Sequence, residues 1–419
     1  MFEGLVRDSS VDGRVYTSRE VFAAEIERIF ARSWSYLGHL SEIPRPGDYR
    51  RVSVAGRELI FIRHRDGTPR ALLNRCAHRG AQLIGKACGR ARRLRCAYHG
   101  WTYGTDGALK QLPLPDGYVG EDAPRAGHPD WALDAYPVET YRDFAFVRLQ
   151  TPSNPLPLEK FLGPAREALD LMADRSPSGS LSIAGGRLAI VLGCNWKVYL
   201  ENLHDGVHPP AVHESSIAAA RAAARVDEPP QEVQWVAANG QPLAVFGDLK
   251  VRCHPYGHSD MSGFRKEADG EDPAYRQALA EAWGAERAGQ ALTRNLHNAC
   301  FYPGASAHPQ YMQMRRLTPL AVDRTLVESW TLRAEGAPES HFRRNIRYAN
   351  TIHSPSSLVK PDDAEAYRRV QRGLESSSGR VSQHRREAGP RDGGTSTALD
   401  EEYVRAQYRA WREYMTAGR

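Results

Sequence analysis

Four residues, Cys76, His78, Cys96 and His99, have the types and the spacing to bind a metal. They form two short pairs, Cys-Ala-His and Cys-Ala-Tyr-His, which residues 79–95 separate. Each pair supplies one thiolate and one imidazole. This donor set suits a [2Fe-2S] cluster with two cysteines on one iron and two histidines on the other. It also suits a structural zinc ion.

The order of the ligands and their flanking residues favours the iron–sulfur cluster. Zinc fingers and ribbons more often pair cysteine with cysteine and histidine with histidine. From residue 96 the chain reads CAYHGWTY, which resembles the second cluster-binding loop of Rieske proteins, and NRCAHRG from residue 74 resembles the first. We therefore expect a Rieske cluster, with zinc as the alternative. Cys88, between the loops, is expected to be a thiol without a metal role.

A second group of possible ligands follows in residues 195–213, which read NWKVYLENLHDGVHPPAVH. Asp205, His208 and His213 have the spacing D-x₂-H-x₄-H. Two histidines and one carboxylate on one face of iron form the facial triad of non-haem Fe(II) oxygenases, which leaves positions open for O₂ and substrate. The two prolines after His208 should break any helix between the histidines.

The carboxylate of such a triad is expected from a distant segment, PDDAE at residues 361–365. Two adjacent acids there precede a predicted helix. One can cap the free N–H groups of the first turn, and the other can face the metal. Taken without the histidines, helix capping alone would explain both acids.

Composition limits the class of protein. The 419 residues are 41% hydrophobic and 25% charged, with a net charge of +6, and this length suits two or three globular domains. No apolar run approaches the roughly 18 residues of a membrane helix, and the first residues do not resemble a secretory signal. The scattered cysteines fit a reducing compartment, so we expect a cytoplasmic protein.

The positive charge is not arranged for nucleic acid. It is spread along the chain, and its one dense stretch, residues 89–95, contains no aromatic side chains that could stack on bases. That stretch is either a solvated loop or a surface that attracts an acidic electron donor.

Local patterns predict the elements that position these residues. We expect an amphipathic helix over 18–34, after a capping-box sequence, and a small all-β domain over 38–155 with the metal motifs in its loops. The apolar run 188–192 predicts a buried strand, and 311–333 predicts two strands around Thr318-Pro319. Further helices are expected over 272–293, 364–374 and 400–416.

Together these motifs resemble the α subunit of Rieske non-haem iron aromatic-ring-hydroxylating oxygenases over nearly the whole chain. The resemblance implies an α+β protein. The Rieske domain would occupy 38–155. A catalytic domain, with a twisted antiparallel sheet flanked by helices (helix-grip type), would be formed by 1–37 and 156–419.

The resemblance also implies roles for single residues. Cys76 and Cys96 would bind one cluster iron, and His78 and His99 the other. His208, His213 and Asp363, rather than Asp362, would bind the mononuclear Fe(II). Asp205 would be the acid that links the iron site to a cluster histidine of the neighbouring subunit, and Asn202 would lie near the iron. His297 and His353 are candidates for the pocket wall. His204, next to Asp205, is either a residue behind the ligands or a surface histidine.

The resemblance implies a terminal oxygenase that hydroxylates a small aromatic substrate, which we expect to be an aromatic acid, to a cis-dihydrodiol or a phenol. The chain has neither a G-x-G-x-x-G fingerprint nor plant-type ferredoxin spacing. Electrons from NAD(P)H must therefore come through a separate reductase, with or without a ferredoxin. We expect a homotrimer, alone or with a small β subunit (α3β3), and no nucleic-acid or membrane partner. The alternatives are a Rieske electron-transfer protein and a zinc-stabilised binding protein, neither with oxygenase activity.

Overall fold

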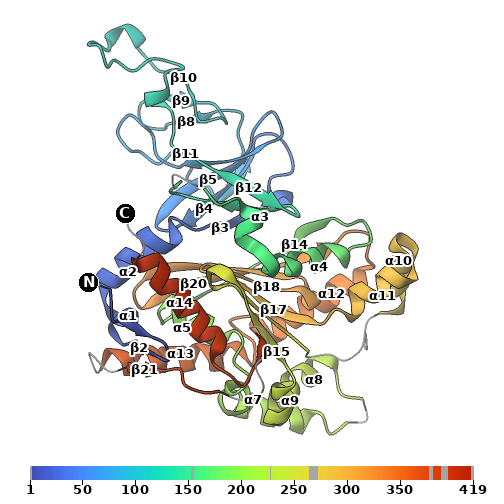
Figure 1. Ribbon diagram of the computed structural model, residues 1–419. Coiled ribbons are helices and arrows are strands. Elements are labelled where there is room, and N and C mark those ends of the chain that lie inside the picture. The colour runs from blue at the N-terminus through green and yellow to red at the C-terminus, as the bar shows by residue number, and fades with distance from the viewer. Residues whose placement is uncertain are drawn as a thin grey trace. The chain divides into compact units, whose positions relative to one another are not determined.

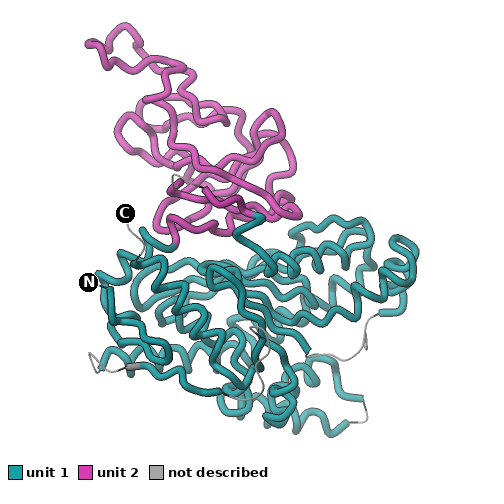
Figure 2. The backbone as a smooth tube through the Cα atoms, in the orientation of Figure 1, with its two compact units in different colours: residues 1–29, 159–419 teal, residues 30–158 magenta. Residues whose placement is uncertain are grey.

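The computed structural model describes residues 2–151, 155–226, 228–263, 272–376, 381–387 and 395–416. The chain divides into two compact units, Phe30–Leu158 and a second that joins Met1–Ile29 to Glu159–Arg419 (Figure 2). The mixture of β sheets and helices confirms the expected α+β class. Among the described residues, no helix is long and apolar enough to cross a membrane.

The unit Phe30–Leu158 consists of short antiparallel strands (Figure 1). Its five-stranded sheet has the order β11 (Ala135–Tyr136), β6 (Pro69–Leu73), β5 (Arg57–Arg63), β4 (Asp48–Val54), β7 (Cys88–Arg90). Its two three-stranded sheets have the orders β12 (Val138–Tyr141), β13 (Phe144–Val147), β3 (Ser35–His39) and β10 (Leu109–Gln111), β9 (Thr102–Tyr103), β8 (Leu94–Arg95). Cys76 and Cys96 belong to the apolar core that forms around Ile60, Leu72 and Trp101.

The larger unit is built on an eight-stranded antiparallel sheet. Its strand order is β14 (Leu181–Leu192), β20 (Arg324–Ala334), β19 (Gln313–Ala321), β18 (Ala305–His308), β17 (Leu296–Phe301), β16 (Ser259–Ser262), β15 (Lys250–Cys253), β22 (Thr395–Thr397). The helices that matter for the site are α2 (Arg19–Glu25), α5 (Trp196–Asn202), α6 (His208–Val212), α7 (Glu214–Ala223), α13 (Lys360–Glu375) and α14 (Glu402–Thr416). Helix α5 contacts β19, and α13 contacts both α5 and α6.

A buried carboxylate fixes the position of α5. Glu25 of α2 accepts hydrogen bonds from Lys197 Nζ (2.7 Å) and Trp196 Nε1 (2.9 Å) of α5, and from Trp411 Nε1 (2.6 Å) of α14. A buried carboxylate that lost one of these donors would be costly. The network therefore holds together three helices that are far apart in the sequence, and α5 ends at the candidate iron site.

Two predicted helices differ from the structure: one ends earlier than predicted, and the other is divided into two. Ser18 does cap α2, its Oγ accepting from Val21 N–H (3.3 Å), but the helical segment ends at Phe30. Trp34 is buried within the other unit, where its Nε1 donates to Leu156 O (2.9 Å). Its position at helical spacing therefore made the helix look longer than it is. The predicted helix 272–293 is two helices, α10 (Pro273–Trp283) and α11 (Ala285–Thr293), because Gly284 has φ +81°.

Two strand predictions were also wrong in part. The run 188–192 belongs to β14, which is an edge strand rather than a buried one, and Val191 is 55% exposed. Thr318 and Pro319 lie inside β19, and the turn to β20 follows Ala321. Strand β18 pairs with β19 only as far as Arg316. The missing N–H of Pro319 therefore costs no ladder hydrogen bond on that side.

Candidate metal centres

The two cysteine–histidine loops have the same backbone construction. In the first, Cys76 N–H donates to Ala81 O (2.8 Å), and Gly80 N–H donates to Cys76 O (2.9 Å). The second repeats both bonds at equivalent positions around Cys96, at 2.8 and 3.1 Å. Gly80 has φ +75° and Gly100 has φ +73°, a conformation that other residues adopt at a cost. Each loop therefore holds its cysteine in the same backbone turn, and the histidine follows two residues later in the first loop and three residues later in the second.

The four donors fit a [2Fe-2S] cluster. Cys76 and Cys96 are 1% and 2% exposed, whereas His78 and His99 are half-buried, with ring centroids 4.6 Å apart. The Nδ1 atom of His78 is buried without a hydrogen-bond partner, which leaves it free to bind iron. Burial raises the pKa of the Cys76 thiol, so a nearby positive charge is needed to hold the thiolate.

Aromatic side chains support the two loops. Tyr103 Oη lies 3.3 Å from Cys76 Sγ and accepts a hydrogen bond from Ala77 N–H (3.1 Å). The ring of His78 stacks on Trp101, with centroids 4.8 Å apart. Hydrogen bonds to cluster sulfur tune its reduction potential, so Tyr103 is placed to do so.

The second candidate site brings together His208, His213 and Asp363 from α6, its C-terminal end and α13. One donor atom from each lies within 4.8 Å of the others. Asp363 Oδ1 lies 3.5 Å from His213 Nε2 and 3.7 Å from His208 Nε2. This carboxylate oxygen is buried and has no hydrogen bond. Three donor atoms that converge in this way fit a divalent metal held by two histidines and one carboxylate.

The prolines between the two histidines begin a helix rather than break one. Pro209 and Pro210 lie in the first turn of α6, where backbone N–H groups have no helical partner and proline is tolerated. The expected break was therefore wrong. The single turn of α6 separates His208, its first residue, from His213, its C-cap, and their ring centroids lie 5.7 Å apart.

The two adjacent acids of α13 have different positions. Asp363 faces both Nε2 atoms, whereas Asp362 Oδ2 lies 3.4 Å from His213 Nδ1 and accepts from Ser216 Oγ (3.2 Å). Successive helical residues point about 100° apart, so both acids cannot face the same atom. Asp362 holds the His213 ring so that Nε2 presents its lone pair.

Sequence analysis missed two contributors from α13. Lys360 Nζ lies 3.4 Å from Asp363 Oδ2, and Tyr367 Oη donates to Asn202 Oδ1 (2.7 Å). Lys360 precedes Asp363 by three residues and Tyr367 follows it by four, so all three lie on one face of the helix. That spacing could have identified both residues once the start of the helix was known.

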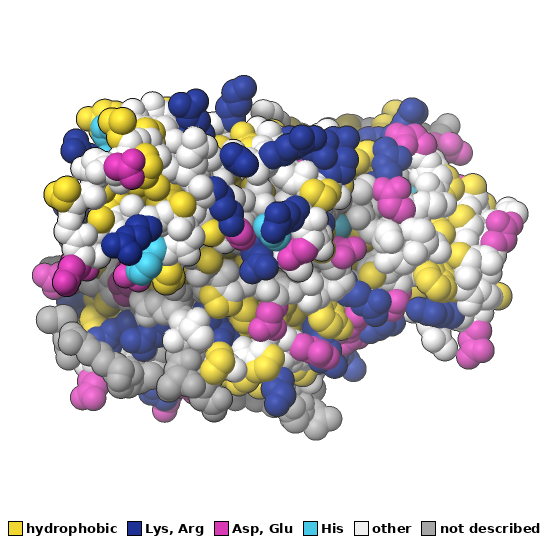
Figure 3. Space-filling view, turned by 90° about the horizontal axis from the view of Figure 1, so that it is seen from above, with side chains coloured by type: hydrophobic (Ala, Val, Ile, Leu, Met, Phe, Trp, Pro, Cys, Tyr) yellow, Lys and Arg dark blue, Asp and Glu magenta, His cyan; other side chains and the backbone are white. Residues whose placement is uncertain are grey.

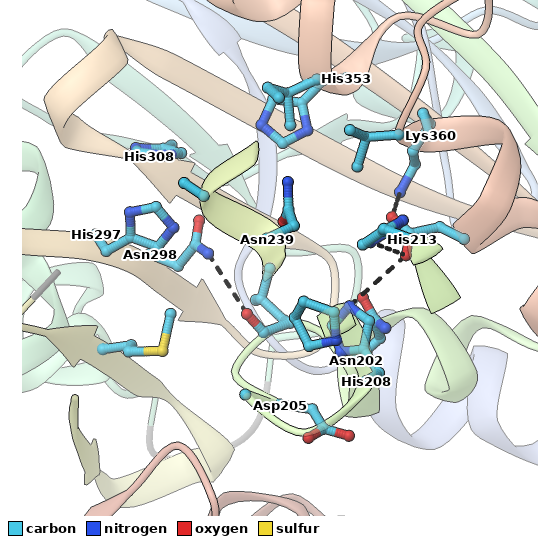
Figure 4. A pocket seen from close by; sticks show the side chains of 18 of the residues that line it. Asn202, Asp205, His208, His213, Asn239, His297, Asn298, His308, His353 and Lys360 are labelled. Atoms are coloured by element: carbon cyan, nitrogen blue, oxygen red, sulfur yellow. Dashed lines mark hydrogen bonds and ion pairs between the residues drawn. The ribbon is translucent and has the colours of Figure 1, made fainter. Parts of the chain in front are cut away.

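Asp205 lies between Asn202 and His208 along the chain, and Figure 4 shows its carboxylate pointing away from the cavity. Its Oδ1 accepts from Val207 N–H (2.7 Å) and from Arg386 Nη2 (3.3 Å). No described residue gives Oδ2 a hydrogen bond. The carboxylate is 24% exposed, so it remains accessible to a further donor.

The three candidate ligands line a cavity of about 280 Å³. In Figure 4, His353 and Lys360 lie on one side of it, and His297, Asn298 and His308 on another. Much of the remaining wall is apolar or aromatic: Leu203, Trp235, Phe246, Leu249, Met261, Tyr311, Tyr348, Ile352 and Val359. His297 and His353 therefore do line the cavity. His204 does not: it is buried elsewhere, with Nε2 3.0 Å from Ser259 Oγ.

Comparison with known families decides the identity. Residues 33–137 match the Rieske [2Fe-2S] domain, and residues 181–417 match the ring hydroxylating alpha subunit (catalytic domain). The chain belongs to the Rieske ring-hydroxylating oxygenase α subunits. It is therefore an oxidoreductase with a Rieske [2Fe-2S] cluster and a mononuclear iron site in the His208, His213 and Asp363 group. The zinc alternative is excluded.

Individual relatives agree with this family. The chain is 31% identical over 380 residues to the anthranilate 1,2-dioxygenase large subunit of Acinetobacter baylyi, covering 86% of this chain and 76% of that one. It is also 31% identical over 375 residues to the toluate 1,2-dioxygenase subunit alpha of Pseudomonas putida, covering 86% and 78%. Among solved structures, naphthalene 1,2-dioxygenase with indole bound in the active site shares the fold, with a TM-score of 0.81 at 24% identity over 99% of this chain and 94% of that one. This α subunit is thus the terminal oxygenase component of a multicomponent system.

Proposed function

We propose that this oxygenase dihydroxylates single-ring aromatic acids. Three relatives support an acid substrate: they are named for anthranilate, toluate and 2-halobenzoate, each as a 1,2-dioxygenase. The observation that carries the proposal is the position of the three converging donors in the wall of a small cavity with many apolar and aromatic side chains. At about 280 Å³ the cavity is near the lower end of ligand pockets, which suits one ring better than several.

We assign the cluster to Cys76, Cys96, His78 and His99, and the mononuclear iron to His208, His213 and Asp363. When bound, the cluster supplies electrons and the mononuclear iron supplies open positions for O₂. The proposed reaction adds both atoms of O₂ to adjacent ring carbons as C–OH bonds and removes one double bond of the ring. Two electrons and two protons balance it, and the electrons come from NAD(P)H.

The chain's own side chains would orient the ring and limit the access of water to it. Phe246, Leu249 and Met261 line the cavity together with Trp235 and Tyr311. These groups offer an aromatic ring apolar contacts and ring-edge contacts. Asn202, which accepts from Tyr367, is a polar group in the same wall, and we assign it a role in positioning the groups near the iron.

We propose that the electron donor is a separate reductase, with or without a ferredoxin, and that it is acidic. No Asp or Glu occurs between Gly67 and Thr105, the segment that contains both cluster loops. Its exposed basic side chains are Arg70, Arg75, Arg79, Lys86, Arg90, Arg92, Arg93 and Arg95. Figure 3 shows Lys and Arg side chains gathered along the upper part of the face in view. A surface of one sign speeds association with a partner of the opposite sign.

We propose a trimer of this chain, alone or with a small β subunit. The exposed carboxylate of Asp205 supports electron transfer between subunits, because it can accept a hydrogen bond from a cluster histidine of a neighbouring copy. Strand β14 also has an exposed apolar edge, with Val191 as one example. An exposed edge strand can pair with another chain.

Steady-state oxidation tests this function. The purified holoprotein, a Rieske-oxygenase reductase system, NADH and O₂ are incubated with benzoate, anthranilate, a toluate, benzene and naphthalene, and products are identified by mass. We expect benzoate and the toluate to gain two oxygen and two hydrogen atoms at ring carbons 1 and 2, and anthranilate, whose carbon 2 bears the amino group, to lose ammonia and CO₂ after the same addition. A gain of one oxygen would replace dihydroxylation with monohydroxylation. Conversion of benzene or naphthalene alone would contradict the acid class.

A further inference from the structure

Arg315 is a buried cation in the wall of the cavity. It lies on β19, is 4% exposed, and is one of the residues that line the space next to the candidate iron ligands. Moving a guanidinium out of water is costly unless an anion or several acceptors compensate its charge. The partners of Arg315 therefore show whether the folded chain compensates this charge by itself.

Three other buried cations of the same unit have carboxylate partners, whereas Arg175 donates to the backbone carbonyls of Ala291, Leu292 and Arg294. Arg316, the next residue of β19, donates to Glu328 Oε2 (2.9 Å) from Nε. Arg405 donates to Asp400 Oδ1 (2.8 Å), and Lys197 donates to Glu25 Oε1 (2.7 Å). In these three cases the charge is neutralised within the fold.

Arg315 donates only to neutral acceptors. Its Nη2 donates to Gln313 Oε1 (3.2 Å) and to His353 Nε2 (2.8 Å). Its Nε is buried and has no acceptor, and no carboxylate of the described residues forms an ion pair with it. Burial and the Arg315 charge both lower the pKa of His353 well below its ordinary value. His353 therefore stays neutral and accepts from the guanidinium.

The position of Arg315 suits a substrate group rather than a structural ion. Arg315, His353, Lys360 and Tyr199 also line a small adjoining cavity, so they form one continuous wall. Lys360 reaches from this wall to Asp363, 3.4 Å from Oδ2. An anion at Arg315 would thus lie on the wall that leads to the iron ligands, and a ring attached to it would remain beside them.

We propose that Arg315 binds the carboxylate of the aromatic substrate and that His353 positions its guanidinium. This inference rests on the proposed function and adds to it a residue that determines acid specificity. Arginine and carboxylate form paired, charge-assisted hydrogen bonds. A substrate carboxylate would supply the anion that the fold does not provide, and an uncharged ring of the same size would leave the guanidinium uncompensated.

Binding to the anaerobic, oxidised holoprotein tests the role without turnover. Calorimetry compares benzoate with benzamide, which has nearly the same shape but no charge, for the wild type, Arg315→Gln, Arg315→Lys and Arg324→Gln. Arg324 is exposed at the start of β20 and controls for net charge. We expect Arg315→Gln to weaken the affinity for benzoate about 10- to 100-fold, as for a lost charged hydrogen bond. The affinity for benzamide should stay within about threefold of the wild-type value. Arg315→Lys should recover part of the loss.

Each result decides the proposal. A wild type that binds benzamide as tightly as benzoate would overturn it even if no variant folded. If Arg315→Gln lost affinity for benzoate and for benzamide equally, Arg315 would have a merely structural role, and this result would also overturn the proposal. Selective loss of benzoate binding, with a matching rise in KM and a smaller change in kcat, would support it. Failure of the wild type to oxidise any ring, despite a reduced cluster and loaded iron, would instead contradict the proposed function, while benzoate binding would still report on Arg315.

Discussion

The two metal sites of this chain are assembled in different ways. The cluster ligands lie in two loops between Cys76 and His99, each closed by its own backbone hydrogen bonds. The iron ligands come from His208 and His213 and, far along the chain, Asp363, and they meet only because α13 packs on α5 and α6. A locally closed site can be recognised from a short sequence, whereas the second site depends on the whole fold.

This difference explains what sequence reasoning achieved. The cluster loops and the two histidines were predicted from local patterns, and the α+β class from the family that these patterns resemble. The choice between Asp362 and Asp363 came only from family resemblance, because two adjacent acids are equivalent until the helix direction is known. Arg315 and Arg316 present the same difficulty. Alternation places them on opposite faces of a strand, but only the packed sheet shows which one faces the cavity.

The largest effect should come from the cluster loops. Cys96→Ser removes one of two thiolates from an iron, so we expect loss of the red-brown colour and a fall of turnover to background. The mononuclear iron should remain, because its ligands belong to the other unit. Visible absorption, iron content and acid-labile sulfide measure this. Cys88→Ser is the control, because Cys88 is exposed, and it should match the wild type. Retention of the cluster in Cys96→Ser would refute the ligand assignment.

Changes to the mononuclear iron ligands should have the opposite effect on the metal content: the iron should be lost and the cluster kept. In Asp363→Ala we expect loss of the mononuclear iron with an intact cluster spectrum, and no turnover. Asp362→Asn is the matched variant: it weakens only the support of His213 and should lower iron affinity about 10- to 100-fold. Metal analysis after dialysis against a chelator distinguishes them. Equal losses in both variants would show that the two acids do not have the separate roles described above.

Asp205 tests the link between the two sites. Asp205→Asn keeps the shape but removes the charge, and we expect turnover to fall about 10- to 100-fold while both metal contents stay unchanged. Cluster reoxidation by O₂ in the presence of substrate should slow in proportion, as followed by stopped-flow absorption. Asp248→Asn, at an exposed acid of the same unit, should have no effect. Unchanged reoxidation in Asp205→Asn would remove this residue from the electron path.

Low pH should lower the free energy of unfolding of the catalytic unit, because its buried histidines are held neutral in the folded state. Burial lowers the pKa of His258 to about 3, and the neutral ring donates to Phe161 O and accepts from Tyr302 N–H, both at 2.9 Å. The unfolded chain binds a proton near pH 6.5, so below that pH the unfolded state is favoured and the free energy of unfolding falls as pH falls. The expected slope is about 1.4 kcal/mol per pH unit for this residue.

His258→Gln keeps a donor and an acceptor but does not titrate. Calorimetric melting between pH 7 and 4.5 should show a shallower fall of Tm for this variant than for the wild type. His39 provides the comparison in the Rieske unit, because burial lowers its pKa to about 4. Parallel curves for wild type and His258→Gln would show that His258 is not held neutral.

A single turnover tests the central claim most directly. The holoprotein, with its cluster reduced and benzoate bound, is mixed with isotopically labelled O₂ in the absence of any donor, and the product is analysed by mass. We predict a dihydrodiol that carries two labelled oxygen atoms, formed as the cluster is oxidised. Oxidation of the cluster with benzoate recovered unchanged would contradict the oxygenase account for aromatic acids and would favour a Rieske electron-transfer protein.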